Sequence, residues 1–490
     1  MTFTSAALNH VPTATAEKAG RTEWTPAAAA LIALVITLVS PAVLGDGDTF
    51  WHIAAGDWIL SHRAIPQTDP FTFSFAGAPW STHEWLSELF LAGAYQCAGW
   101  SGVVTLTGAA LAATAFILGH RLARDLDGAA LIVVLTLGLG LQLGSLLARP
   151  HMLALPLLAA WAAGLFAARD KKSAPSLALL PLMTLWTNMH GGFLFGLALI
   201  GPFALEALLE APTDKKLAVA RSWATFGLLA VSAAMLNPRG LSALLFPFHL
   251  MGMKSLAGIA EWQPERFDQI GPLEIELFAL LGLALLRPVK LAPLRLVLLI
   301  GLIHLSLHHT RHAMMLGLIA PMILARPIAE AIGQPSPAPA RMGPREIFAT
   351  LALLAALAGL RLAIPIERQD GPMAPISALA AVPAELRDKP VLNHYGFGGY
   401  LIFSGVKPYI DGRTDLFGDA FLDHYDRIVA ADSPALDEVL QKSAIDWAIF
   451  PPATPVARAL SARPGWKKIH GDEFAVVYAR EEALPPEIRR

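Results

Sequence analysis

The amino-acid sequence predicts an α-helical polytopic membrane protein that carries a small α/β domain at its C-terminal end. The 490 residues are 54% hydrophobic and only 16% charged, and the mean hydropathy is +0.50. An ordinary soluble domain does not have this composition. Apolar runs of about 20 residues, the length that crosses a bilayer as a helix, recur as far as residue 363. Beyond that residue the apolar runs shorten to the length of strands.

Composition also excludes some classes of function. The formal net charge is −2, and basic runs with interleaved aromatic residues are absent from the sequence, so nucleic acid is not an expected partner. Cys97 is the only cysteine. An intrachain disulfide and a thiolate metal site are therefore both excluded.

Residues 1–24 are polar, carry charges of both signs and lack the small-residue cleavage site of a secretory signal. We interpret them as a cytoplasmic N-terminal tail that leads into an uncleaved first span.

About eleven spans follow from the apolar runs, since roughly 17 to 25 residues suffice for each. They lie near residues 25–44, 101–119, 128–147, 151–168, 173–188, 191–209, 217–235, 273–287, 292–307, 312–325 and 346–363. The fifth, eighth and tenth are short, as in helices that are tilted, broken or partly buried in a bundle.

Lys and Arg predict the orientation. With the N-terminus in the cytoplasm, the inner segments before residue 364 hold sixteen of these residues and the outer loops hold six, a clear positive-inside bias. The loop 45–100, inside the transmembrane region 25–363, and the C-terminal domain 364–490 then both face outward. In a bacterium this means a multi-pass protein of the cell inner membrane whose outer face is the periplasm.

The C-terminal domain alternates short apolar runs with helical patterns. Strands are expected at 390–393, 408–411, 446–450 and 474–478, and helices at 419–431, 435–442 and 455–462. Gly396, Gly398 and Gly399 have two interpretations, a plain backbone turn or a loop that binds phosphate.

The loop 45–100 holds the first candidate catalytic residues. Asp46 and Asp48 emerge where the first span meets water, and Trp51 belongs to a group of tryptophans suited to that depth. A carboxylate held there can act as a base on a substrate presented by lipid, or it can simply be solvated. Glu84, after His83, is a second acidic candidate, or part of the polar face of an amphipathic helix.

Three arginines in short outer loops, Arg149, Arg239 and Arg311, are candidates for binding a lipid phosphate, because guanidinium binds phosphate bidentately. The alternative is that they extend to ordinary headgroups. The spacing of His304, His308 and His312 predicts one shared helix face. That face could hold a metal ion together with Asp46 or Glu84, or form a hydrogen-bonded stripe at the interface.

These features together resemble the GT-C class of integral membrane glycosyltransferases. The resemblance rests on one apolar span followed at once by Asp46-Gly-Asp48-Thr-Phe-Trp51-His52, then many spans and an outward α/β domain. The runs DTFWHIAAGDWI, IPQTDPFTFSFAGAPWSTHEWL, NHYGFGGYLIF and PYIDGRTDLFGDAFLDHY are also similar to a group of bacterial membrane proteins placed beside that class. By this match Asp48, or failing it Asp46, takes the position of the catalytic base.

The resemblance implies an enzyme that transfers a sugar from a polyprenyl-phosphate donor to a periplasmic or lipid-linked acceptor with inversion. The second-loop acidic pair and the sequon-reading signature of oligosaccharyltransferases are absent from the sequence, which favours transfer of one hexosyl or pentosyl unit over transfer of a whole glycan. Arg311, Arg239 and Arg149 would bind the donor phosphate. Substrate-binding residues would be His52, Trp51, His83, His190, His308 and His312.

No cofactor is required if arginine and histidine neutralise the phosphate, and a divalent metal ion is left open. The expected partners are the donor and membrane lipids, while the sequence identifies no protein partner. Two other classes remain alternatives: a transporter or flippase of lipid-linked sugars, and a non-catalytic scaffold for envelope assembly. A transporter should show internal repeats, and none is evident in the sequence.

Overall fold

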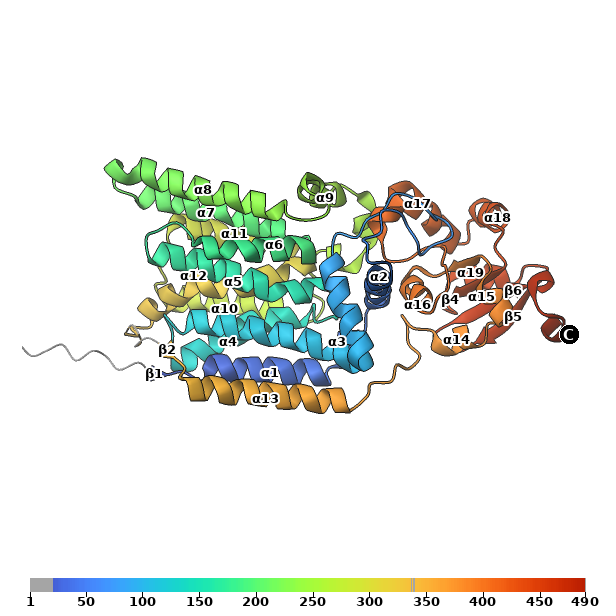
Figure 1. Ribbon diagram of the computed structural model, residues 1–490, viewed down its shortest axis with the longest axis horizontal. Helices are drawn as coiled ribbons and strands as arrows, with labels where there is room; N and C mark the ends of the chain where they lie inside the picture. The colour runs from blue at the N-terminus through green and yellow to red at the C-terminus, as the bar shows by residue number, and fades with distance from the viewer. Residues whose placement is uncertain (1–20, 336, 338–339, 490) are drawn as a thin grey trace, which may run out of the picture.

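The computed structural model describes residues 21–335, 337 and 340–489. The helices of the N-terminal two thirds lie roughly side by side as a bundle, and the C-terminal domain sits at one end of it (Figure 1). The two-residue strands β1 (Arg21–Thr22) and β2 (Ala340–Arg341) pair in parallel at the opposite end of the bundle.

Each expected span coincides with a helix. These helices are α1 (Thr25–Val39), α3 (Trp85–Leu122), α4 (Gly128–Leu143), α5 (Pro150–Asp170), α6 (Leu180–Met189), α7 (Phe193–Glu210), α8 (Lys216–Ala234), α10 (Pro272–Leu286), α11 (Pro293–His308), α12 (Ala313–Ala331) and α13 (Pro344–Ala363). Among the described residues, six helical segments are long and apolar enough to cross a membrane. The mainly helical membrane fold is thus confirmed, whereas the count of eleven crossings stays a prediction.

Some boundaries differ from those expected. α1 ends at Val39 and a 3-10 turn, Pro41–Leu44, follows it, because proline lacks the backbone N–H that a continuing helix needs. The tenth segment is longer than expected and runs to Ala331. A further helix, α9 (Leu241–Met251), lies in the outer loop after α8, where no element was expected.

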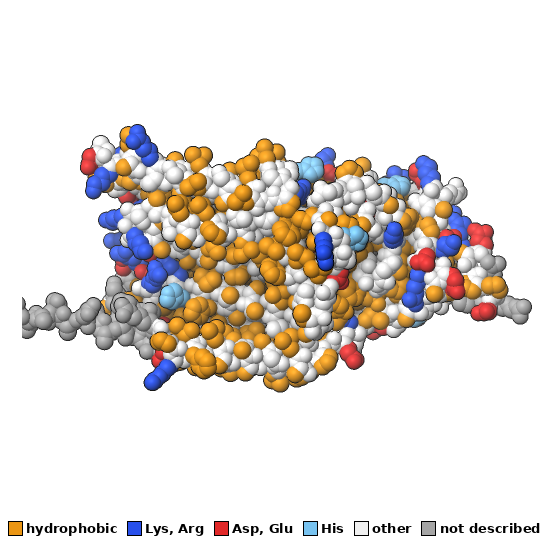
Figure 2. Space-filling model, viewed as in Figure 1, with side chains coloured by type: hydrophobic (Ala, Val, Ile, Leu, Met, Phe, Trp, Pro, Cys, Tyr) orange, Lys and Arg blue, Asp and Glu red, His pale blue; other side chains and the backbone are white. Residues whose placement is uncertain are grey.

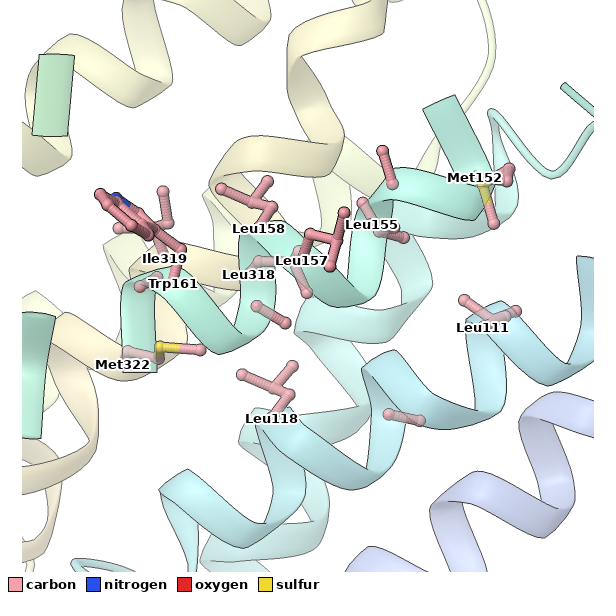
Figure 3. Close-up of a cluster of buried hydrophobic side chains, with 14 of the residues drawn as sticks. Leu111, Leu118, Met152, Leu155, Leu157, Leu158, Trp161, Leu318, Ile319 and Met322 are labelled. Atoms are coloured by element: carbon pink, nitrogen blue, oxygen red, sulfur yellow. The ribbon is translucent and has the colours of Figure 1, made fainter. Parts of the chain in front are cut away.

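The core of the bundle forms around α5. Figure 3 shows Trp161 of α5 in one cluster with Leu111 and Leu118 of α3 and with Leu318 and Met322 of α12. All five side chains are buried. The Trp161 indole N–H also donates to the backbone oxygen of Gly196 at 2.8 Å, so that even the polar atom of this large ring is satisfied inside the bundle.

Apolar side chains are spread over the face of the bundle seen in Figure 2, and Lys and Arg gather at the end that bears β1 and β2. Near that end the Glu206 carboxylate forms ion pairs with Arg169 at 3.3 Å and with Arg295 at 2.8 Å. An apolar band with positive charge at one end is the distribution expected of a bundle in a bilayer.

The loop between α1 and α3 is ordered by the helix α2 (Asp48–His62), which lies between the bundle and the C-terminal domain (Figure 1). α3 bends at Ala98 and Gly99, and Gly99 has a φ of 56°, a conformation that glycine adopts at no steric cost. The part of α3 before this bend lies at the end of the bundle that faces the C-terminal domain, and the part after it continues into the bundle (Figure 1).

The C-terminal domain has three layers around a four-stranded sheet of order β3-β4-β6-β5. The strands are β3 (Val391–Asn393), β4 (Trp447–Phe450), β5 (Trp466–Gly471) and β6 (Val476–Arg480). One face packs on α17 (Thr414–Val429), α18 (Ser433–Lys442) and α19 (Pro455–Ser461). The other packs on α14 (Ile376–Ala380), α15 (Ala384–Arg387) and α16 (Gly398–Phe403).

The strands of this domain differ from the prediction in two places. Residues 408–411 form no strand and make only a single bridge, from Pro408 to Val391, because proline cannot donate to a strand ladder. The edge strand β5 was missed because it carries Lys467 and Lys468, and so lacks the apolar run of the inner strands.

Candidate active site at the N-terminus of α2

Asp46 and Asp48 are held together by the start of α2. The backbone N–H of Asp48 donates to Asp46 Oδ1 at 2.9 Å, and Asp48 occupies the first turn of the helix. An acidic side chain is favoured there because the free N–H groups of a helix start carry partial positive charge. The local sequence thus fixes both carboxylates at one point.

Arg149 neutralises both carboxylates from the start of α5. Its Nη1 lies 3.2 Å from Asp46 Oδ2 and its Nη2 lies 3.0 Å from Asp48 Oδ2. Pro150 is the first residue of α5 and leaves Arg149 extended as its N-cap, so that the side chain reaches back to α2. Nη1 is also 3.2 Å from Glu261 Oε2.

Burial raises the pKa of Asp48 to about 7, and the positive charge of Arg149 opposes part of that rise. The neighbouring carboxylate of Asp46 adds to it. A carboxylate with a pKa near neutrality can both lose a proton before a reaction and accept one during it. Asp48 therefore has the properties of a general base.

Glu261 links this group to a second arginine. Its Oε1 lies 3.1 Å from Arg311 Nη1, and the Arg311 guanidinium stacks on the Trp262 ring at 4.4 Å. Both Glu261 and Arg311 line a cavity of about 420 Å³ whose other walls mix apolar residues, such as Leu273 and Met314, with the polar Ser145, His151, Glu265 and Thr310. Arg311 is the guanidinium in this lining, and an anionic phosphate would bind there by replacing Glu261 as its partner.

Three imidazoles surround Glu84. His83 Nε2 and His190 Nε2 each lie 3.6 Å from Glu84 Oε1, and His52 Nε2 lies 3.9 Å from Oε2. Burial raises the pKa of Glu84 to about 8 and lowers the pKa values of His52, His83 and His190. At neutral pH this cluster is polar and largely uncharged, which suits hydroxyl groups better than ions.

The cluster contains polar atoms that make no hydrogen bond. Glu88 Oε1 accepts from Thr82 at 2.6 Å and lies 3.4 Å from His52 Nδ1. His52 Nε2 and Glu88 Oε2 are buried without a hydrogen-bond partner, as is Arg239 Nη1. Because unpaired buried polar atoms are costly, we interpret these atoms as groups that a polar ligand would satisfy.

The C-terminal domain closes one side of Asp48. A methyl group at Gly412 would collide with Asp48 Oδ1, and one at Gly399 with the Gly47 carbonyl. The Tyr395 hydroxyl donates to the Gly412 carbonyl at 3.2 Å. The glycine cluster before Tyr400 therefore allows close packing of backbone on α2, the plainer of the two sequence interpretations.

Arg413 stabilises the contact between the C-terminal domain and the loop before α3 through ion pairs. Its guanidinium forms a bidentate pair with Asp411, at 2.8 and 2.6 Å, and its Nη1 donates to Asp69 Oδ1 at 2.7 Å. It also stacks on Trp80 at 4.6 Å. Arg413 was not singled out from the sequence, although Asp411-Gly412-Arg413 lies in one of the runs that carried the resemblance.

Arg239 is joined to the Glu84 cluster through an aromatic ring: its guanidinium stacks on Phe246 at 4.5 Å, and the Phe246 ring lies 4.4 Å from the His83 ring. Arg239 makes no ion pair with a carboxylate in the described part of the chain. Two predicted histidines lie apart from this cluster. His308 is exposed and contacts His309, while His312 contacts the Leu305 carbonyl. The expected helix face of His304, His308 and His312 is wrong, because α11 ends at His308 and a 3-10 turn carries His312.

The remaining predicted residues gather at α2. The Trp51 ring stacks on His52 with ring centroids 3.7 Å apart, and Trp80 meets Trp51 edge-on at 6.5 Å.

Within residues 21–335, 337 and 340–489, no three His, Cys, Asp or Glu side chains are grouped so as to hold a metal ion. A role for a metal ion therefore stays untested.

Comparison with known proteins supports the fold. The chain is similar to a crystal structure of the Archaeoglobus fulgidus oligosaccharyltransferase in the apo form, with a TM-score of 0.52 and 12% identity, over 88% of this chain and 70% of that one. No protein-family model matches the sequence, and no curated protein matches it either. At this identity the likeness shows a GT-C-like fold and nothing finer.

Proposed function

We propose that this protein is a membrane glycosyltransferase that moves one hexosyl or pentosyl unit from a polyprenyl-phosphate donor to a hydroxyl acceptor, with inversion. The observation that carries the proposal is the juxtaposition at α2: a carboxylate with a pKa near 7, Asp48, lies within 3.0 Å of Arg149. Glu261 contacts both Arg149 and Arg311, and Arg311 lines a cavity with polar and apolar walls.

In the proposed reaction the acceptor oxygen attacks the anomeric carbon while the bond from that carbon to the phosphate oxygen breaks. The acceptor proton passes to Asp48, and the electron pair leaves with the polyprenyl phosphate. Arg311 and Arg149 would stabilise the charge of the leaving group. General-base assistance of this kind is typically worth about 10²–10⁴-fold in rate.

The cluster around Glu84 is proposed to bind the sugar hydroxyls. Neutral imidazoles and a protonated carboxyl group offer both donors and acceptors, and the unpaired atoms of His52 and Glu88 lie among them. The Lys and Arg side chains at the far end of the bundle (Figure 2) support a periplasmic location for this site in a bacterial inner membrane.

The test is a transfer assay with the purified protein in lipid nanodiscs. Polyprenyl-phosphate-linked hexoses and pentoses are offered with glycan and glycolipid acceptors, and release of polyprenyl phosphate is measured together with the glycosylated product. Release coupled one to one with product supports the proposal. Movement of intact donor across a vesicle bilayer, without cleavage, would instead identify a flippase.

A further inference from the structure

Glu276 of α10 is a carboxylic acid inside the apolar part of the bundle, away from the site at α2. Only 4% of its surface is exposed, and its Oε2 is buried without a hydrogen-bond partner. No hydrogen bond or ion pair joins it to another side chain in the described residues. An ionisable group at membrane depth is costly when left alone, and it commonly marks a ligand.

The carboxyl group lines a groove of about 350 Å³ between α4, α10 and α12. The remaining lining residues are all apolar, among them Ala130, Ala279 and Pro321. α10 itself buries only Leu273 and Glu276. Protein packing therefore leaves most of this helix uncovered, and whatever fills the groove contributes to holding α10 against α4.

The groove offers a cation one carboxyl group, because Glu276 is the only polar side chain among its lining residues. Glu274, two residues earlier, projects from a different face of α10, and Glu265 lies close to Gly271 before the helix, so neither belongs to the lining. The nearby Arg266 is already paired with Asp268 at 2.9 Å. Glu276 lies about one helical turn beyond Pro272, where α10 begins at the end of the bundle nearer Arg311. Glu276 therefore lies about 6 Å below the start of α10, a distance that a lipid headgroup at this end of the bundle can reach.

We propose that the groove binds a phospholipid that carries a primary ammonium group, with the ammonium hydrogen-bonded to Glu276 and one acyl chain lying along α4 and α12. A primary ammonium offers three N–H donors to a carboxylate. A choline headgroup has none, and a polyprenyl chain has no donor along its length. The inference is independent of glycosyl transfer, and its test uses no activity.

The experiment measures which lipid the purified full-length protein retains. The protein is reconstituted in nanodiscs with equal parts of phosphatidylethanolamine, phosphatidylcholine and phosphatidylglycerol, extracted mildly, and analysed by native mass spectrometry. We expect the wild type to retain phosphatidylethanolamine preferentially. Glu276→Gln should weaken that retention about tenfold, as expected when a charged hydrogen bond is lost.

Two variants serve as controls. Glu274→Gln changes an acid on the same helix that is not fully buried and should leave retention unchanged. Ala279→Phe fills the groove while keeping the carboxyl group, and it should abolish retention. The proposal is overturned if Glu276→Gln retains as much phosphatidylethanolamine as the wild type, if the three lipids are retained equally, or if added polyprenyl phosphate occupies the groove in their place.

Discussion

The guanidinium of Arg413 lies 2.7 Å from the carboxylate of Asp69, and both side chains are fully buried. One residue belongs to the C-terminal domain and the other to the loop before α3, so the ion pair joins two parts of the chain that are 344 positions apart. The pair holds Gly412 against Asp48, and the shape of the candidate site therefore depends on both parts.

Removing Arg413 should destabilise this junction strongly. Arg413→Met leaves Asp69 and Asp411 buried without their partner, and breaking a buried ion pair in this way typically costs about 3–5 kcal/mol. Arg427→Met is the matched control, because Arg427 pairs with Asp432 at 3.0 Å on the surface. Thermal unfolding in detergent measures both variants, and equal midpoints would show that the Arg413 pair does not hold the junction.

Adding one methyl group at Gly412 should reduce transfer while leaving the fold intact. Gly412→Ala places the methyl against Asp48 Oδ1, so either the carboxylate or the segment must move. Gly371→Ala is the control, because a methyl group there meets open space. We expect the turnover rate to fall at least tenfold in the first variant only. Unchanged turnover would mean that the position of Asp48 tolerates movement of the C-terminal domain.

The helices were predictable from the sequence, and the contacts between them were not. Runs of about 20 apolar residues fix the spans because a bilayer demands that length, and Asp48 stood out by following the first span. That Arg149 pairs with Asp48, about a hundred residues away, depends on how α5 packs beside α3. Arg413 was not predicted because a buried ion pair leaves no periodic pattern in the sequence. His312 was placed on the wrong face because the prediction continued the helical spacing beyond the end of α11.

Arg311 should matter more for donor binding than Arg63. Arg311→Ala removes a guanidinium from the lining of the cavity and leaves Glu261 with less neutralising charge near the expected phosphate. The loss of a charged hydrogen bond to phosphate is worth about 1.5–3 kcal/mol. Arg63 is exposed at the end of α2, where water screens its charge.

The measurement is the affinity for a polyprenyl-phosphate sugar that carries a fluorescent label, in nanodiscs. Arg239→Ala is tested beside these two variants, because Arg239 Nη1 is buried without a hydrogen-bond partner. A loss of affinity in the Arg239→Ala protein alone would show that the phosphate binds outside the cavity that Arg311 lines. Equal affinities for the Arg311→Ala and Arg63→Ala proteins would remove Arg311 from the donor site.

Transfer should depend on pH with a midpoint near 7. The pKa of Asp48 is raised to about 7 by burial, and a base acts only when it has lost its proton, so the rate should fall as the pH drops below that value. Far below the midpoint the fall approaches tenfold per pH unit. Because Arg149 lowers the pKa of Asp48, Arg149→Gln should shift the midpoint to higher pH. A shift to lower pH would show that another group titrates.

Asp48→Asn is the sharpest test of the proposed mechanism. Asparagine keeps the size of the side chain and much of its hydrogen bonding but cannot accept the acceptor's proton, so donor binding should persist while turnover falls by about two orders of magnitude or more. Asp46→Asn should cost less, because Asp46 accepts the Asp48 backbone N–H and so orients the loop. Asp57→Asn is the control, since Asp57 is a half-buried acid further along α2 that accepts from Gln96 at 2.7 Å and lies outside the Arg149 ion pairs. If only Asp46→Asn abolished transfer, the base would be Asp46, and full activity in both variants would remove the glycosyltransferase mechanism from this loop.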